Sequence, residues 1–193
     1  MVDVAAAAAA IARGEVVAYP TETFYGLAVD ALNESALSEL RALKGRAAEK
    51  AFSLLVSGRA MLESLCAQIS PLAERLMAQY WPGPLTLALP ARPGLPASIV
   101  ADGCVAVRVS PHPLAQALVV AAGRPITATS ANPADAAPPR TASEVAVYFS
   151  SPRLLILDGG ATPGGQPSTL ARVRGEHVEI LRQGTVVVAS AGW

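Results

Sequence analysis

Short apolar runs with a two-residue period alternate along this chain with longer runs of helical period, and this alternation constrains the fold most. Several strand-like runs follow one another across short loops, and helical stripes separate the others. The pattern predicts about eight strands and five or six helices. This order favours an α/β or α+β fold, in which helices flank a sheet of mixed strand direction. No repeat or linker divides the chain, so we expect one domain over residues 1–193.

Capping residues predict where several helices begin and end. Asn33 is a candidate N-cap for a helix that ends at Gly45, and Ser70 followed by Pro71 begins another. The spacing of Thr141 and Glu144 is that of a capping box. An alanine-rich run over 2–12 is expected to be a first helix rather than a signal peptide, because no basic segment precedes it.

Composition excludes a protein that is drawn to partners by its overall charge. The formal net charge is zero, with 52% hydrophobic and 16% charged residues, so any anion site must be local. No apolar run reaches the roughly eighteen residues of a membrane span. Cys66 and Cys104 lack the spacing of a metal site and are expected to be unbridged core residues in a reducing compartment. We therefore expect a cytoplasmic protein with no membrane association.

The two lysines of the chain, Lys44 and Lys50, lie on either side of Arg46 in one loop. An ammonium group is a compact point charge and a guanidinium is a planar fork, so the two serve different contacts around phosphate. A cation at the end of a helix also complements the helix dipole, which would explain Lys44 alone. It does not explain three cations in seven residues. Chance clustering is the alternative that composition leaves open.

Arg108 interrupts an apolar strand that is expected over 105–109. Val105, Val107 and Val109 share one face of such a strand, and Arg108 lies on the other. An arginine in so apolar a strand needs an anionic partner or an open cleft. Exposure on an edge strand is the alternative.

Hydroxyl and amide side chains gather in three loops that follow expected strands. The pairs are Thr21 with Thr23, Ser130 with Asn132, and Ser168 with Thr169; Arg182 ends the last hairpin. Loops after strands are common sites of ligand contacts in α/β proteins, although Ser and Asn also stabilise ordinary turns.

Several common catalytic motifs are absent from the sequence. There is no G-x-G-x-x-G after a strand, no P-loop, no H-E-x-x-H and no G-x-S-x-G. His112 and His177 are isolated, which argues against a histidine metal cluster or a Ser-His-Asp triad. Cations with neutral donors suit a polyphosphate ligand, because positioning and charge stabilisation dominate in such sites.

Six segments together resemble the signature of the YrdC-like family of threonylcarbamoyl-AMP synthases. They occur in the family's order, cover roughly residues 10–185 and are highly specific as a set. The segments are Val17-Ala18-Tyr19-Pro20-Thr21-Glu22-Thr23-Phe24-Tyr25-Gly26-Leu27, Lys44-Gly45-Arg46, Trp81-Pro82-Gly83-Pro84-Leu85-Thr86, Val105-Ala106-Val107-Arg108-Val109 with His112-Pro113, Thr129-Ser130-Ala131-Asn132, and Pro167-Ser168-Thr169.

The resemblance implies a twisted open mixed sheet with a concave, positively lined cleft, and a nucleotidyltransferase reaction. L-threonine, bicarbonate and ATP would give threonylcarbamoyl-AMP and pyrophosphate, with Mg²⁺ held mainly by the nucleotide phosphates and no protein metal site. A downstream tRNA threonylcarbamoyl transferase complex would use the product to modify adenosine next to the anticodon. Weak binding of tRNA or double-stranded RNA stays open.

The resemblance also implies roles for individual residues. Thr23, Arg108 and Ser168 would bind L-threonine, with Arg108 facing its carboxylate. Lys44 and Arg46 would be catalytic. The ATP contacts would come from Lys44, Arg46, Lys50, Cys104, Ser130, Asn132 and Arg182.

The chain departs from the family pattern at three places. Ala47 stands where the family usually has proline, and Pro133-Ala134-Asp135 stands where a small residue, serine and glycine usually follow the asparagine. The chain also stops soon after Arg182, as expected for the short form of the family.

The altered loop after Asn132 motivates an alternative, a catalytically silent YrdC-like protein that binds nucleotide or RNA. Zero net charge and the scarcity of lysine count against it. A third hypothesis is carbamoyl transfer to another acceptor, as in fused relatives.

Overall fold

The computed structural model describes residues 2–45, 47, 50–151 and 153–188, in which six α-helices flank two β-sheets. The predicted mixed α/β fold is confirmed, with its strands divided between two sheets where the sequence pattern predicts one. Arg46 lies outside the described residues.

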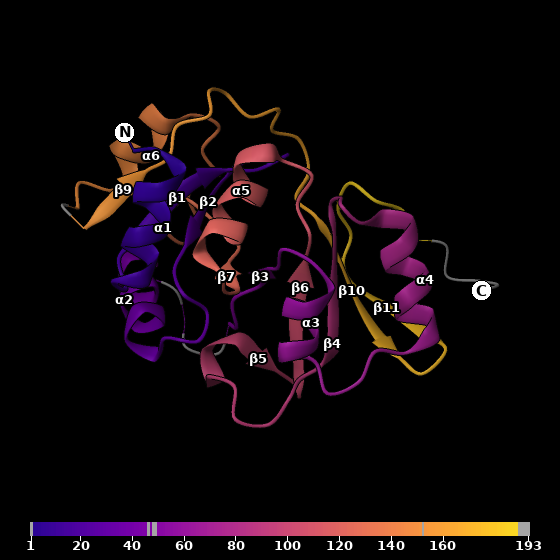
Figure 1. Ribbon diagram of the computed structural model, residues 1–193. Coiled ribbons are helices and arrows are strands. Elements are labelled where there is room, and N and C mark those ends of the chain that lie inside the picture. The colour runs from indigo at the N-terminus through magenta and orange to yellow at the C-terminus, as the bar shows by residue number, and fades with distance from the viewer. Residues whose placement is uncertain (1, 46, 48–49, 152, 189–193) are drawn as a thin grey trace.

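A four-stranded sheet with the order β8-β2-β1-β9 forms one part of the molecule (Figure 1). Its strands are β1 (Val16–Pro20), β2 (Tyr25–Ala28), β8 (Thr129–Ser130) and β9 (Leu154–Ile156). β2 is antiparallel to β1 and to β8, whereas β9 is parallel to β1. All five residues of β1 are buried, because both faces of this sheet are covered.

A seven-stranded sheet forms the other part, with the order β11-β10-β4-β6-β3-β7 and β5 paired beside β6. Parallel pairs (β4 with β10, β3 with β6) alternate with antiparallel pairs, as in a mixed sheet. Its strands are β3 (Leu54–Leu55), β4 (Leu85–Pro90), β5 (Val100–Ala101), β6 (Cys104–Arg108), β7 (Ile126–Thr127), β10 (Thr169–Arg174) and β11 (His177–Arg182).

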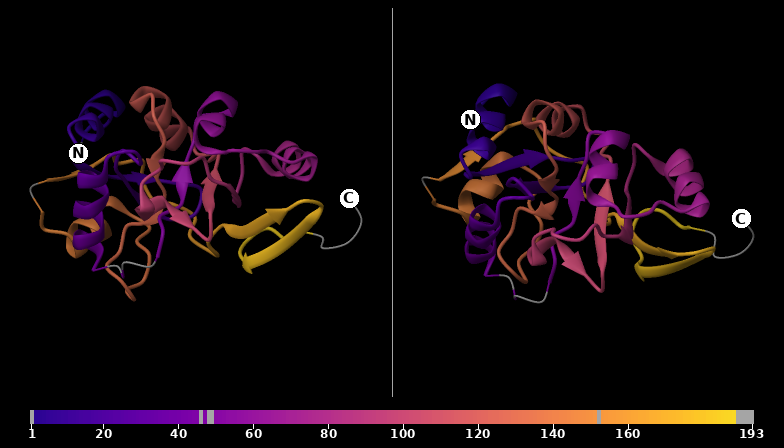
Figure 2. Two further views of the ribbon diagram at one scale, coloured as in Figure 1. Left: turned by 90° about the horizontal axis from the view of Figure 1, so that it is seen from below. Right: turned by 60° about the horizontal axis from the view of Figure 1, so that its bottom comes forward.

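Four helices lie in a row on one side of the strands, as both views in Figure 2 show: α1, α5, α3 and α4. α1 and α5 pack on each other and on β1, where Val17 and Tyr19 join their apolar cluster. α2 and α6 contribute to a second cluster with the alternate residues Val16 and Ala18. The helices are α1 (Val4–Ala12), α2 (Glu34–Lys44), α3 (Arg59–Leu65), α4 (Pro71–Tyr80), α5 (Pro113–Ala122) and α6 (Ala142–Tyr148).

The predicted helix caps are confirmed. Asn33 accepts a hydrogen bond from the Ala36 amide at the start of α2, and Gly45 adopts the left-handed conformation at its end (φ 59°). The capping box of Thr141 and Glu144 begins α6. Local hydrogen bonding determines these boundaries, so the sequence alone predicts them.

One predicted strand differs from the structure in a way that shapes the site. The sequence over 125–129 is typical of a single strand, but these residues form β7 and the start of β8, which belong to different sheets. The amide of Ala128, between them, donates to the Ser53 carbonyl at 2.7 Å. This segment joins the two sheets.

The residues after β11 pack back on the loop before β10. The Thr169 hydroxyl donates to the Val186 carbonyl at 2.6 Å, and the amides of Gly184 and Val186 donate to that hydroxyl. A Cβ on Gly184 would lie 2.1 Å from the Pro167 carbonyl oxygen, so only glycine fits there. Val188 is buried in the main core.

Two further sequence expectations can be compared with the structure. Cys66 and Cys104 are both free thiols, as expected, but only Cys66 is buried in the core, whereas Cys104 is half-buried. Among the described residues, none of the helices has the length and apolar character needed to cross a bilayer.

Candidate active site

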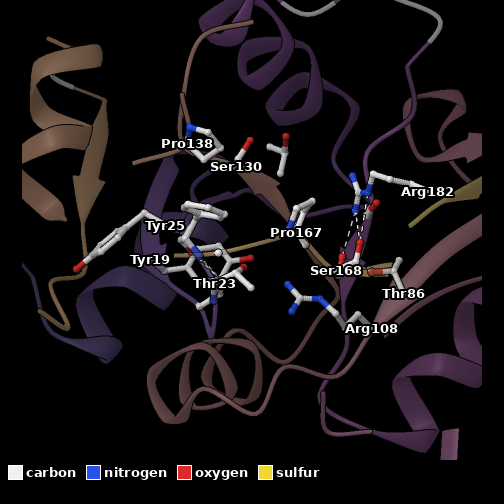
Figure 3. A pocket seen from close by; sticks show the side chains of 17 residues that line it. Tyr19, Thr23, Tyr25, Thr86, Arg108, Ser130, Pro138, Pro167, Ser168 and Arg182 are labelled. Atoms are coloured by element: carbon white, nitrogen blue, oxygen red, sulfur yellow. Dashed lines mark hydrogen bonds between the residues drawn. The ribbon is translucent and has the colours of Figure 1, made fainter. Parts of the chain in front are cut away.

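A cavity of about 490 Å³ opens where the two sheets meet (Figure 3). It is bounded by the loop after β1, by β2 and β8, by β4 and β6, and by the loop before β10. Its lining residues are Tyr19, Thr21, Thr23, Phe24, Tyr25, Gly26, Ser53, Thr86, Arg108, Ala128, Thr129, Ser130, Pro138, Gly165, Pro167, Ser168 and Arg182. This lining includes five residues that the sequence analysis assigns to substrates: Thr23, Arg108, Ser130, Ser168 and Arg182.

Arg108 ends β6, an interior strand between β4 and β3, and extends into the cavity (Figure 3). Val105, Val107 and Val109 lie in the core, as the alternation predicts. The arginine is only 7% exposed, which excludes the edge-strand alternative. It has both an anionic partner, the carboxylate of Glu22, and an open cavity.

Burial dominates the electrostatics of Arg108. Desolvation lowers the pKa of its guanidinium to about 10, and the charge of Arg182 acts in the same direction. The carboxylate of Glu22 favours the charged form. An anion that enters the cavity therefore meets a buried cation that has little contact with water. In such a place an ion pair is stronger than it is in solvent.

Ser168 lies between two polar partners, Thr86 and Arg182, in the cavity lining. Its hydroxyl is 3.0 Å from the hydroxyl of Thr86, and its carbonyl accepts from the Arg182 guanidinium at 2.8 Å. Arg182 also donates to the Ser168 hydroxyl at 3.2 Å. Partial burial against this loop lowers the pKa of Arg182. Leu170 of β10 pairs with Thr86 of β4 on one side and with Arg182 of β11 on the other, so both partners lie near Ser168 at the start of β10.

Thr23 lies in a tight turn between β1 and β2. The Thr21 hydroxyl donates to the Phe24 carbonyl at 2.7 Å and accepts from the amides of Thr23 and Phe24. The Thr23 carbonyl accepts from the Gly164 amide at 2.7 Å. These bonds fix the turn so that the Thr23 side chain is held at the cavity wall.

Lys44 lies beside the cavity and holds the loop that carries Ser130. Its ammonium donates to the carbonyls of Ser130 and Asn132, both at 2.5 Å, and its side chain is buried. The Lys44 carbonyl accepts from the Ala134 amide at 2.8 Å. Lys44 therefore ties the end of α2 to the loop after β8.

The altered loop after Asn132 has a defined turn. The side-chain amide of Asn132 donates to the backbone carbonyls of Pro133 and Ala136. Asp135 has a φ of 65°, in the left-handed region that favours glycine, at the position where the family pattern has glycine. The turn is thus formed without that glycine.

Four predicted ATP contacts, Lys44, Lys50, Cys104 and Asn132, are not among the lining residues. Lys44 and Asn132 contact each other in the loop after β8. Cys104 begins β6, at the opposite end from Arg108, and lines a second cavity of about 380 Å³. Arg108 is four positions after Cys104, which corresponds to about 13 Å of strand. Lys50 is exposed in the loop after α2, where its carbonyl accepts from Arg41.

The fold brings to the cavity several side chains for which the sequence indicates no role. Thr86 was quoted only as part of a motif, yet it is buried and contacts the Ser168 hydroxyl. Tyr19, Tyr25 and Ser53 also line the cavity. Thr86 could have been noticed because it is a polar residue at the second position of an otherwise apolar strand. Ser53 carries no local signal.

The cavity suits an anionic ligand with several hydrogen-bonding groups. Its described lining combines two guanidinium groups with hydroxyls, and contains no carboxylate or imidazole. No cluster of three His, Cys, Asp or Glu side chains occurs among the described residues. Such a site can bind and orient charged groups and stabilise developing negative charge.

Comparison with known proteins identifies relatives of the whole chain. A threonylcarbamoyl-AMP synthase of Bacillus subtilis is 37% identical over 185 residues, which are 95% of this chain and 54% of the relative. One of Vibrio cholerae is 35% identical over 178 residues, 91% of this chain and 94% of the relative. This chain thus spans about half the length of the Bacillus relative.

Among solved structures, Sua5 of Pyrococcus abyssi in complex with L-threonine superposes with a TM-score of 0.89 at 38% identity. The match covers 94% of this chain and 54% of that one. The profile of the Sua5/YciO/YrdC family, described as telomere recombination, matches residues 9–184. The chain therefore belongs to the Sua5/YciO/YrdC family.

Proposed function

We propose that this protein is an L-threonylcarbamoyladenylate synthase, an enzyme of the nucleotidyltransferase type. The observation that carries the proposal is the lining of the cavity, where Arg108, Ser168 and Arg182 border one space. Relatives named threonylcarbamoyl-AMP synthase, and the structure of one relative with L-threonine, support it.

L-threonine would bind at the wall formed by Thr23, Arg108 and Ser168. A guanidinium suits a carboxylate because its planar N–H groups match the two oxygens. Arg108 is held at the end of an interior strand, so little conformational freedom is lost when it binds. The hydroxyls of Thr23 and Ser168 lie within the same cavity and can bond the polar groups of the amino acid.

ATP would bind along the loop of Ser130 and Asn132 and beneath Arg182, with Lys44, Arg46 and Lys50 near its phosphates. In this structure the Lys44 ammonium is bonded to the loop carbonyls, so its first role is to hold that loop. A contact to Cys104 requires a nucleotide that extends along β6. Mg²⁺ carried on the phosphates would supply further positive charge when bound.

The chemistry follows from these positions. The amine of threonine and bicarbonate form a carbamate with loss of water, and a carbamate oxygen attacks the α-phosphorus of ATP. The bond from that phosphorus to the bridging oxygen breaks, and pyrophosphate leaves. Cations fixed around the cavity stabilise the charge that develops, without reorganising during the reaction. The adenylate would then pass to a tRNA threonylcarbamoyl transferase complex.

The decisive experiment measures pyrophosphate release by the purified protein. We expect release only when ATP, L-threonine and bicarbonate are all present, together with an adenylate product of the corresponding mass. ATP turnover without threonine, or no turnover with all three substrates, would contradict the proposal. Salt-dependent binding of RNA without any pyrophosphate release would instead favour the silent, RNA-binding alternative.

A further inference from the structure

Glu22 lies behind Arg108, in the loop between β1 and β2. Its Oε1 pairs with Nη1 of Arg108, and its Oε2 accepts from the Ser110 hydroxyl at 2.6 Å. The Glu22 side chain is 15% exposed and does not line the cavity, whereas Arg108 does. The carboxylate therefore contacts the arginine from outside the substrate space.

Ser110 fixes the second oxygen of this carboxylate. It is 1% exposed, and its oxygen accepts from the His112 amide at 3.2 Å, which leaves the hydroxyl proton for Glu22. A continuous chain of donors thus runs from the backbone before α5 through Ser110 to Glu22. Both carboxylate oxygens are engaged, so the carboxylate cannot rotate without losing a bond.

The charges around Arg108 show what this carboxylate supplies. The buried phenol of Tyr19, on β1, lies near Arg108 and favours its charged form. The cation of Arg182, on β11, disfavours it. Glu22 contacts Arg108 from the loop after β1. Glu22 is the anion of this group. It balances a charge that burial and a second cation both disfavour.

We propose that Glu22 is a positioning residue for L-threonine, acting through Arg108. It orients the guanidinium toward the cavity and keeps it charged, and Ser110 holds Glu22 in place. This inference rests on the proposed function, because it assigns the substrate carboxylate to Arg108.

The test compares Glu22→Gln with wild type and with Glu176→Gln. The control loses the same charge from a surface pair with Arg75, far from the cavity lining. Binding of L-threonine and of ATP is measured by calorimetry, and unfolding is followed by heat. We expect Glu22→Gln to weaken threonine binding about tenfold or more. ATP binding should stay within about twofold, as should both ligands in the control.

The dependence of threonine binding on pH separates positioning from a general loss of structure. Without Glu22 the buried guanidinium of Arg108 loses its anionic partner, which lowers its pKa, so the alkaline loss of binding begins at lower pH than in wild type. Titration of the threonine amine is common to both proteins and cancels. Ser110→Ala keeps the charge and is expected to weaken threonine binding less, without this shift.

Unchanged or tighter threonine binding in Glu22→Gln would overturn the inference, and so would an equal loss of both ligands together with a lower unfolding temperature. These outcomes are distinct from failure of the proposed function. A wild-type protein that releases pyrophosphate while Glu22→Gln binds threonine normally overturns only the inference. Selective loss of threonine binding, in a protein that never releases pyrophosphate, overturns only the proposed synthase.

Discussion

Arg108 and Lys44 are both buried cations beside one cavity, but their surroundings give them different roles. Arg108 lines the cavity, whereas the Lys44 ammonium is bonded to two backbone carbonyls. Substitutions at the two residues should therefore have different consequences.

Arg108→Ala should raise the KM for L-threonine, because it removes the cation that faces the carboxylate. Hydrogen bonds to charged groups contribute about 1.5–3 kcal/mol, which corresponds to about tenfold to a hundredfold in KM. The KM for ATP should change much less. Steady-state pyrophosphate release at varied threonine and at varied ATP measures both constants. A larger effect on the KM for ATP would refute the assignment.

Lys44→Met should destabilise the loop after β8, because the carbonyls of Ser130 and Asn132 lose a charged donor. We expect the free energy of unfolding to fall by about 2 kcal/mol, as measured in urea. Arg174→Met is the control that removes a cation at an exposed position and should change it by less than about 0.5 kcal/mol. Equal stability of the two variants would show that these bonds contribute little.

Among the elements, the segment after β11 supports the loop of Ser168 from behind. Gly184 packs against the backbone of Pro167 and Ser168. The Thr169 hydroxyl donates to the Val186 carbonyl and accepts from the Gly184 amide. The sequence that follows Arg182 has no clear helical or strand periodicity. Its packing could not be predicted, because the partners are separated by some fifteen residues and no local pattern links them.

Gly184→Ala should displace the loop of Ser168, because the added Cβ would lie 2.1 Å from the Pro167 oxygen. We expect a lower unfolding temperature together with a raised KM for threonine, and a loss of stability of about 1–3 kcal/mol. Gly58→Ala is the control, since nothing lies within 4 Å of its Cβ. Wild-type kinetics in Gly184→Ala would show that the tail does not support the site.

Elements defined by local chemistry were predictable, and those defined by distant partners were not. The caps at Asn33 and Thr141 and the alternation around Arg108 were read correctly from neighbouring residues. The division of 125–129 between two sheets was missed, since the pairing partners of β7 and β8 lie far away in the chain. Family motifs indicated residues of the cavity but gave no sign of the partners of Lys44.

At the scale of the whole molecule, the two sheets are joined through Thr127. Its hydroxyl donates to the Leu27 carbonyl at 2.9 Å and accepts from the Val29 amide at 3.1 Å. Its carbonyl accepts from the Tyr19 hydroxyl at 3.1 Å. The residue is fully buried, so these groups cannot exchange their partners for water.

Thr127→Val keeps the shape of the side chain and removes its hydroxyl, which leaves two buried backbone groups without that partner. We expect the free energy of unfolding to fall by about 2–3 kcal/mol in urea, with a single cooperative transition. Thr185→Val, whose hydroxyl is exposed, should cost less than about 1 kcal/mol. A Thr127→Val protein as stable as the control would contradict a structural role for this junction.

The lining of the cavity begins at Tyr19 and ends at Arg182, so the site uses nearly the full chain. The parallel pair of β1 with β9 can form only after β9 has been synthesised, and the pair of β4 with β10 only after β10 has been. During synthesis, most of the polypeptide must therefore emerge from the ribosome before the cavity can form and bind a substrate. Contacts so distant in sequence slow folding, and nascent chains of this protein should depend on protection until the last hairpin emerges.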